Sequence, residues 1–166
     1  MDDAMRFVGQ HYLDETLRPS IERIVAGRKP CKLDPNRARD RGHIHNNVLN
    51  LRGYVEEEAI RASAVHCPTV MCQLFHILYE IAIAFFPDNK EVRYSVISGF
   101  IFLRFVAPAI LGPKLFGLTS ETIDTQTNRT LTLISKTIQS LGNVACARTV
   151  WCKEKYMSSL YSTFYD

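Results

Sequence analysis

The chain has 166 residues, of which 46% are hydrophobic and 22% are charged. This length is that of one ordinary domain, and the composition excludes an intrinsically disordered chain and an integral membrane protein. The formal net charge of +3 is too small to indicate nucleic-acid binding by itself.

The cysteines and the apolar runs indicate an intracellular protein. The five cysteines stand at irregular spacings without a CxxC pair: Cys31, Cys67, Cys72, Cys146 and Cys152. The opening residues, MDDAMRFVGQ, hold no continuous apolar segment, so no signal peptide is predicted. We therefore expect free thiols in a reducing compartment. The longest apolar runs, such as AIAFF and GFIFL, are too short to cross a bilayer.

The first predicted helix covers residues 2–26. Its apolar side chains recur at helical spacing: Val8, Tyr12, Leu17, Ile21, Ile24 and Val25. Pro19 predicts either a kink or the start of a second short helix, and Gly27 predicts the helix end. Residues 28–46 are predicted to be a basic loop. Its positive charges include Arg37, Arg39 and Arg41. Such a loop is either solvated or in contact with an anionic partner or membrane surface.

Two helices are predicted next. Residues 47–63 are expected to bury one face, made of Val48, Leu51 and Val55. Residues 69–86 lie between Pro68 and Pro87, and proline is common at a helix start and disruptive inside a helix. The apolar stripe predicted for this second helix consists of Leu74, Leu78, Ile81 and Phe85.

The most apolar predicted helix begins at the capping signal DNKE, in which Asp88 is the N-cap residue and Glu91 the third residue after it. It is expected to run to about residue 106 and to lie in the centre of a bundle, because it is apolar on most sides. Pro108 and the pair Gly112 and Pro113 are predicted to end it.

The last predicted helices cover residues 128–141, closed by Gly142 and Asn143, and residues 153–165. No alternating apolar pattern predicts a strand, so the fold class is predicted to be all-α. The helix over residues 128–141 carries two stripes. The predicted core stripe is Leu131, Ile134, Ile138 and Leu141. The polar stripe is Lys136, Gln139, Ser140 and Asn143. The polar stripe is either a solvated face or a surface for an anionic or polar ligand.

Arg104 is the unusual residue of the apolar stretch FIFLRFVAPAIL. We expect this arginine to be buried and therefore paired or hydrogen-bonded. It either ties down a helix end or a carboxylate, or holds a functional group in place. His43, His45 and Asp40 do not complete a set of four metal ligands, so no metal site is predicted.

Residues 102–110, FLRFVAPAI, resemble the FLR-x-x-x-PAI signature of Ras GTPase-activating proteins. The signature residues are Phe102, Leu103, Arg104, Pro108, Ala109 and Ile110. The segments HYLDETLRPSIERI, CPTVMC, RTLTLISK, LGN and KEKYM are also similar to that family. The resemblance covers nearly the whole chain and is greatest for the branch that carries calcium-dependent lipid-binding modules and a pleckstrin-homology domain. It implies that residues 1–166 are the central part of a single Ras-GAP domain, a helical bundle of the RasGAP type that is incomplete at both ends.

The resemblance implies a regulator of an enzyme rather than an enzyme. Members of the family bind GTP-loaded Ras and supply an arginine finger in trans, which accelerates hydrolysis by about 10³–10⁵. GTP and Mg²⁺ belong to the Ras partner, so this chain is expected to hold no cofactor. Arg104 is implied to support the finger loop. The residues implied to contact Ras are Leu103, Lys136, Asn143 and Lys153.

The family's finger loop, FRxNxLxTK, matches nothing in the sequence, so the finger arginine is expected upstream of Met1. The chain alone is therefore expected to be a weak or inactive activator. The alternatives are a non-catalytic Ras-binding module and a helical scaffold that binds acidic lipid through the basic loop. The resemblance also implies a cytoplasmic protein that is recruited to the inner face of the plasma membrane in the full-length parent. Anionic lipid would then be a partner of other domains, and nucleic acid is not expected as a partner.

Overall fold

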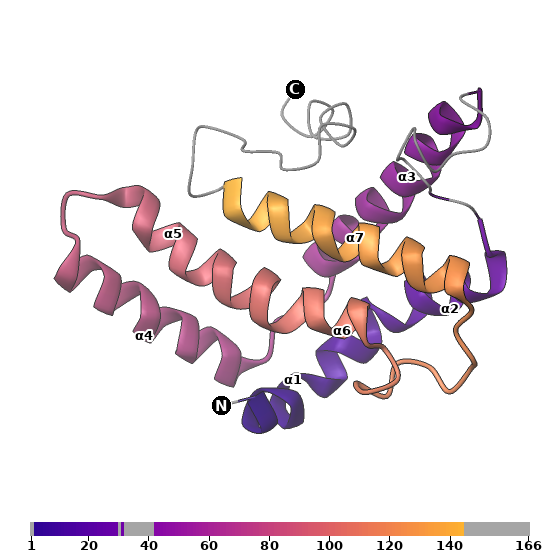
Figure 1. Ribbon diagram of the computed structural model, residues 1–166. Coiled ribbons are helices and arrows are strands. Elements are labelled where there is room, and N and C mark those ends of the chain that lie inside the picture. Colours follow the sequence, from indigo (N-terminus) through magenta and orange to yellow (C-terminus); the bar gives the residue numbers. More distant parts are fainter. Residues whose placement is uncertain (1, 30, 32–41, 145–166) are drawn as a thin grey trace.

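The structure is a computed structural model that describes residues 2–29, 31 and 42–144 (Figure 1). Within its helices, the side chains of residues 2–6, 42–43, 58–64, 141, 143 and 144 are outside the described set. Every regular element of the described part is a helix, which confirms the all-α prediction. The predicted basic residues Arg37, Arg39 and Arg41 and the predicted helix over residues 153–165 lie outside the described residues.

The N-terminal segment forms two helices, α1 (Asp2–Thr16) and α2 (Arg18–Gly27). Pro19 lies in the first turn of α2, so the second of the two predicted alternatives is correct. Helix α2 ends in a left-handed residue, but this residue is Arg28 (φ 44°) rather than Gly27. Its backbone N–H donates to the Ile24 carbonyl at 3.1 Å and closes the helix. The predicted apolar stripe is buried apart from Val8, which is half-buried against the core.

Helix α3 (Gly42–Ala64) begins earlier than predicted. Leu51 and Val55 are buried in it, and Val48 packs against them, as the sequence predicts. One ion pair lies within α3, between Arg52 and Glu56, and another joins α2 to α3, between Arg23 and Glu57.

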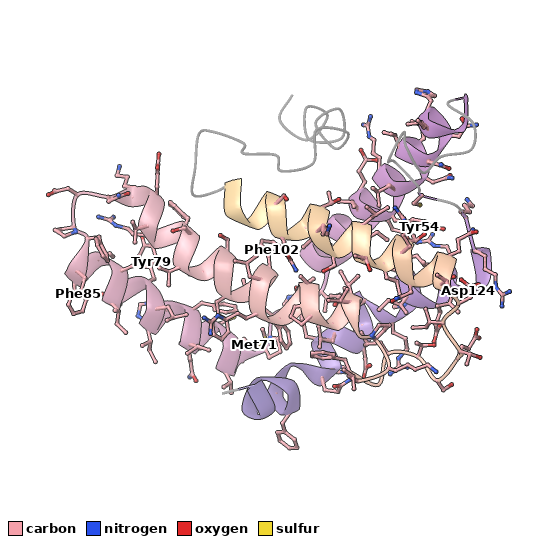
Figure 2. All side chains as sticks on the ribbon, viewed as in Figure 1. Tyr54, Met71, Tyr79, Phe85, Phe102 and Asp124 are labelled. Atoms are coloured by element: carbon pink, nitrogen blue, oxygen red, sulfur yellow. The ribbon has the colours of Figure 1, made fainter. Side chains whose placement is uncertain are left out.

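Helix α4 (Thr69–Phe85) buries a face that only partly overlaps with the predicted stripe. Its buried residues are Met71 and Ala82, whereas Ile81 is 49% exposed and Phe85 is 76% exposed. Phe85 points outward at the end of α4 in Figure 2. At about 100° per residue, the mean direction of Met71 and Ala82 lies about 60° around the helix axis from that of the predicted stripe, and Leu74 and Leu78 of that stripe are half-buried. The polar residues Gln73, His76 and Glu80 lie opposite the buried face, but the apolar residues extend well beyond it, so the apolar stripe by itself did not mark its centre.

The apolar segment after α4 is one continuous helical rod made of α5 (Lys90–Ser98), η1 (Gly99–Val106) and α6 (Ala107–Leu111) (Figure 1). Its N-cap residue is Asn89 rather than Asp88, because the Asn89 side chain accepts from the backbone N–H groups of Glu91 (3.1 Å) and Val92 (3.3 Å). The rod continues past residue 106 and through Pro108, contrary to the prediction, and ends before Gly112, at the second predicted break.

The middle of the rod is a π-helix of 8 residues, η1. The Ala107 N–H donates to the Phe102 carbonyl, five residues back, which is the π pattern. In a regular α-helix the ring of Pro108 would crowd the carbonyl of Arg104, four residues earlier. The wider π turn relieves this crowding, and the helix therefore continues through Pro108.

Helix α7 (Thr125–Val144) runs antiparallel to the rod. It begins before the predicted start because Asp124 caps it, accepting from the Thr127 N–H at 2.7 Å. Gly142 lies inside α7 rather than after its end. The predicted core residues Leu131, Ile134 and Ile138 are buried, and the Leu141 side chain lies outside the described set.

The core lies where α1, α2 and α3 meet the rod and α7. Helix α4 packs along α5 on the opposite side of the rod, so that the rod lies between α4 and α7 (Figure 1). Helix α5 has no buried residue.

The rod, Lys90–Leu111, is the one helix of the described part that is long and apolar enough to cross a membrane, with a mean hydropathy of 1.8 over its most apolar window. The run GFIFL therefore belongs to a longer apolar helix than the sequence predicts, so the expectation that it is too short to cross a bilayer is wrong by length, whereas AIAFF lies at the end of α4. Length and composition alone do not distinguish a membrane span from the central helix of a bundle. Here the rod packs against α4 on one side and α7 on the other.

Candidate functional site

The candidate site is the face formed by η1 and α7, because these two elements carry the signature and the polar stripe. Leu103 is half-buried on η1, and Arg104 is exposed. The prediction that Arg104 is buried is therefore wrong. Arg104 makes no hydrogen bond or ion pair with the described residues. Since the rod continues to Leu111, no helix end lies next to Arg104 to receive its donors.

Two aromatic side chains of the signature segment hold η1 against glycines of its neighbours. Phe102 faces Gly142 of α7, where an added Cβ would lie 2.9 Å from the Phe102 Cβ. Figure 2 shows Phe102 between the ribbons of the rod and α7. Phe105, which is 2% exposed, faces Gly9 of α1, and an added Cβ there would lie 2.1 Å from its ring. Both helices thus approach η1 at positions where a side chain would not fit.

Two hydrogen bonds tie the rod to α7 on either side of Leu103 and Arg104. The Ser98 hydroxyl donates to the Gly142 carbonyl at 3.0 Å. The buried Ser135 hydroxyl donates to the Ala107 carbonyl at 3.1 Å. These bonds fix the register of two antiparallel helices. Between them lie Leu103 and Arg104 on η1.

On α7 the same two bonds bracket most of the polar stripe. Lys136 is exposed, whereas Gln139 and Ser140 are half-buried. Gln139 donates to the Ser135 hydroxyl at 3.4 Å, so it faces the rod as well as solvent. The predicted polar stripe is thus a mixed surface, with Lys136 at its most exposed point. The Asn143 side chain and all of Lys153 lie outside the described residues.

Several polar residues of α7 are buried beside the apolar core, which the sequence pattern did not indicate. They are Thr127, Thr130, Ser135 and Thr137. The Thr137 hydroxyl donates to the Leu133 carbonyl at 2.9 Å, one turn earlier. A short hydroxyl side chain that is satisfied within its own helix can be buried at low cost. More of the α7 circumference is therefore covered than the apolar stripe alone predicts.

Ser98 and Gly142 are residues of the site that sequence reasoning missed. Gly142 was interpreted as a helix end. A glycine within an amphipathic helical pattern is also a signal of close backbone approach, and the structure shows that second meaning. No comparable signal marks Ser98, because its partner is a carbonyl 44 residues away in sequence.

A cleft of about 250 Å³ lies between α2 and α3, away from this face. Its lining residues are Arg23, Gly27, Lys29, Leu49, Asn50, Gly53, Tyr54 and Glu57. Burial raises the pKa of Tyr54 above its usual value, and the neighbouring Cys31 adds to the rise. The ion pair of Arg23 with Glu57 already neutralises much of the charge at the cleft. None of the signature residues lines it.

Among the described residues, no three histidine, cysteine or acidic side chains are close enough to hold a metal ion. The face of η1 and α7 therefore offers hydrogen-bond donors, one exposed lysine and an apolar leucine. This set fits a protein surface better than a buried small molecule.

Comparison with known proteins places this face within a described family. Residues 39–143 match the family described as GTPase-activator protein for Ras-like GTPase. The chain is 59% identical over 168 residues to a GTPase-activating protein of Drosophila melanogaster, which covers 99% of this chain and 14% of that protein. It is 48% identical over 166 residues to Ras GTPase-activating protein 3 of Rattus norvegicus, covering 99% of this chain and 20% of that protein. It is 40% identical over 171 residues to Ras GTPase-activating protein 2 of Homo sapiens, covering 100% of this chain and 20% of that protein. The chain thus spans a fifth or less of the length of these relatives.

Proposed function

This chain belongs to the family of GTPase-activator proteins for Ras-like GTPases, and on that basis we propose that it binds a Ras-family GTPase in the GTP-loaded form. The intact protein would stimulate hydrolysis of the GTP held by its partner and so switch off signalling. GTP and Mg²⁺ would be carried by that partner. This chain would regulate the reaction without performing it.

The observation that carries the proposal is the paired arrangement of η1 and α7. Both elements lie almost entirely within the matched residues 39–143. Hydrogen bonds at each end of the pair fix Leu103 and Arg104 relative to Lys136. A surface whose elements are held in this way can meet a partner without a large ordering cost.

Each site residue has a distinct proposed role. Leu103 would make an apolar contact with the GTPase. Lys136 would bring a positive charge to it, and Asn143 and Lys153 would extend this contact. Arg104 would support the finger loop. Its guanidinium carries five N–H donors, none of which is used by the described residues, so they can serve the backbone carbonyls of a loop that packs over η1.

The chain alone is proposed to bind without strong stimulation. In this family an arginine finger stabilises charge in the transition state and accounts for about 10³–10⁵ of the rate. No segment of the sequence has the pattern of the finger loop. Binding and catalysis would therefore separate in this chain. In cells, the full-length parent would be cytoplasmic and recruited to the inner face of the plasma membrane, through anionic lipid bound by other domains.

Binding is tested by titrating the chain against Ras loaded with a non-hydrolysable GTP analogue and against Ras loaded with GDP. We expect preference for the GTP form. Lys136→Glu is expected to weaken that binding by about tenfold or more, because it reverses a charge at the contact. Lys114→Glu makes the same charge change in the exposed loop after α6 and should leave binding unaltered. Equal binding of both nucleotide forms, or equal effects of both variants, would refute the proposal.

Catalysis is tested by single-turnover GTP hydrolysis on Ras with the chain in excess, with helicity checked on the same sample. We expect bound Ras to hydrolyse GTP at close to its intrinsic rate. Acceleration by several orders of magnitude would show that an arginine within residues 1–166 acts as the finger. Binding to anionic vesicles without binding to Ras would instead favour the lipid-binding scaffold.

A further inference from the structure

Two cysteines meet at the start of α4. Pro68 is the N-cap residue of this helix, so Cys67 is the residue before the cap and Cys72 is the fourth helical residue. These are the two positions whose side chains contact each other in the hydrophobic staple, which fixes the angle at which a chain enters a helix. In this chain both positions of the staple carry thiols.

The contact between the two residues is direct. The Cys72 thiol donates to the Cys67 carbonyl at 3.6 Å, and the Cys72 N–H donates to the Pro68 carbonyl at 3.0 Å. The Cys72 sulfur therefore lies against the backbone of Cys67. Cys67 is half-buried and packs against the core, whereas Cys72 is exposed. Both are free thiols.

We propose that Cys67 and Cys72 form a reversible disulfide that covalently staples the first turn of α4. This modification site is independent of the proposed binding of Ras. It requires a two-electron oxidant of the peroxide class.

The two thiols have different roles in the reaction, because one is exposed and the other is half-buried. Burial raises the pKa of the Cys67 thiol to about 11, and the neighbouring Cys72 adds to the rise. Cys67 therefore stays protonated at neutral pH, and the exposed Cys72 is the thiol that meets the oxidant.

The reaction proceeds in two balanced steps. The Cys72 thiol loses its proton, and the thiolate attacks one oxygen of hydrogen peroxide. The O–O bond breaks, the sulfur becomes a sulfenic acid, and the other oxygen leaves as hydroxide, which takes up the released proton to give water. The Cys67 sulfur then attacks the Cys72 sulfur and gives up its proton. The S–O bond breaks and a second water leaves. Two thiols and one peroxide thus yield one disulfide and two waters, and a dithiol reductant reverses the change.

The staple lies next to a contact that reaches the candidate site. Met71, which is 1% exposed, anchors the same turn in the core. One turn further along α4, the Phe75 ring meets the Phe100 ring of η1 edge-on, with centroids 6.2 Å apart. Oxidation would therefore restrain the end of α4 that touches the π-helix.

The test uses the whole chain with Cys146→Ser and Cys152→Ser, which leaves Cys31, Cys67 and Cys72. The protein is treated with hydrogen peroxide, unfolded, alkylated and digested with trypsin. Residues 62–90 form one tryptic peptide that contains both cysteines of the staple. We expect this peptide to lose two hydrogen atoms, to resist alkylation and to recover after reduction, while Cys31 is alkylated throughout.

Two controls make the result decisive. In a Cys67→Ser variant, Cys72 lacks its partner, so its sulfenic acid should accumulate and be trapped by dimedone. In denaturant, the unmodified pair should oxidise to the disulfide at least about tenfold more slowly than in the folded chain, because folding holds the thiols together. Circular dichroism before and after oxidation confirms that the fold is retained.

The proposal is overturned if Cys72 is oxidised while Cys67 still accepts the alkylating reagent. It is equally overturned if Cys72 pairs with a second chain, if the folded and unfolded chains form the disulfide at the same rate, or if peroxide sufficient to oxidise glutathione leaves both thiols reduced.

Discussion

Replacing Gly142 by alanine tests how closely α7 approaches the π-helix. An alanine Cβ at this position would lie 2.9 Å from the Phe102 Cβ and 3.3 Å from a ring carbon of the same residue. The shorter contact cannot be relieved by rotating a side chain, because the Cβ of Phe102 is fixed to the backbone. The two helices must move apart by several tenths of an ångström, which also lengthens the 3.0 Å bond from Ser98 to Gly142.

The magnitude follows from two opposing effects. Overpacking a well-packed contact costs about 1–3 kcal/mol. Replacing glycine by alanine inside a helix contributes about 1 kcal/mol of stability. The net expectation for Gly142→Ala is a loss of about 0–2 kcal/mol.

Gly53→Ala supplies the matched control. Gly53 is exposed in α3, and a Cβ added there has no heavy atom within 4 Å. This variant should therefore gain about 1 kcal/mol from helix propensity alone. The difference between the two variants, about 1–3 kcal/mol, isolates the packing cost at Gly142.

The assay is thermal unfolding of the whole chain, followed by circular dichroism. For a chain of this size, 1 kcal/mol shifts Tm by about 2–4 °C. Binding to GTP-loaded Ras is measured on the same samples and should weaken for Gly142→Ala only, because only this variant displaces α7 from η1. If Gly142→Ala raises Tm as much as Gly53→Ala does, the close approach of the two helices is refuted.

Three further predictions concern single groups. Ser135→Ala should lower the free energy of unfolding by about 1–3 kcal/mol, because the buried Ala107 carbonyl loses the hydrogen bond from the Ser135 hydroxyl. The measurement is chemical denaturation, and an unchanged midpoint would exclude that hydrogen bond. Hydrogen bonds from Thr127 lower the pKa of Asp124 in the folded chain below its usual value of 3.8. The stability that the Asp124 carboxylate contributes is therefore complete above pH 3.8 and is lost as the pH falls through the lower pKa of the folded chain. Asp124→Asn should abolish this part of the acid dependence of Tm, and a profile with the same acid dependence would contradict it. Burial raises the pKa of Cys31 to about 11. In the folded chain at neutral pH, a maleimide should therefore label the exposed Cys72 long before Cys31. Equal labelling rates would argue against the burial of Cys31.

The exposure of Arg104 changes how the signature is understood. An arginine within an apolar helix is expected to be buried and paired, yet this one faces solvent on a π-helix. The energetic problem of a buried charge therefore does not arise in this chain. What the segment buries instead is Phe105, while Phe102 packs between η1 and α7.

The sequence by itself determined the fold class, the helical segments and the family resemblance. Where a helix carries polar residues on one side, its apolar pattern also indicated the buried face. Leu131, Ile134 and Ile138 of α7 are buried as predicted, and so are Leu51 and Val55 of α3. Helix boundaries were less accurate, because Asp124 and Asn89 each act as caps through local hydrogen bonds that compete with neighbouring candidates.

Only the tertiary structure decided which side of α4 is buried, where Arg104 lies and what Gly142 contacts. The apolar residues of α4 extend well beyond its buried face, and Val70, Ile77 and Ile81 are exposed, so the neighbouring α5 and α1 decide which of them are covered. Arg104 lies on the π-helix that accommodates Pro108. The sequence pattern of a regular α-helix does not predict this π-helix. The contacts of Phe102 with Gly142 and of Phe105 with Gly9 join residues far apart in the chain. Such contacts depend on how whole helices pack against each other, which the local periodicity of the sequence does not predict.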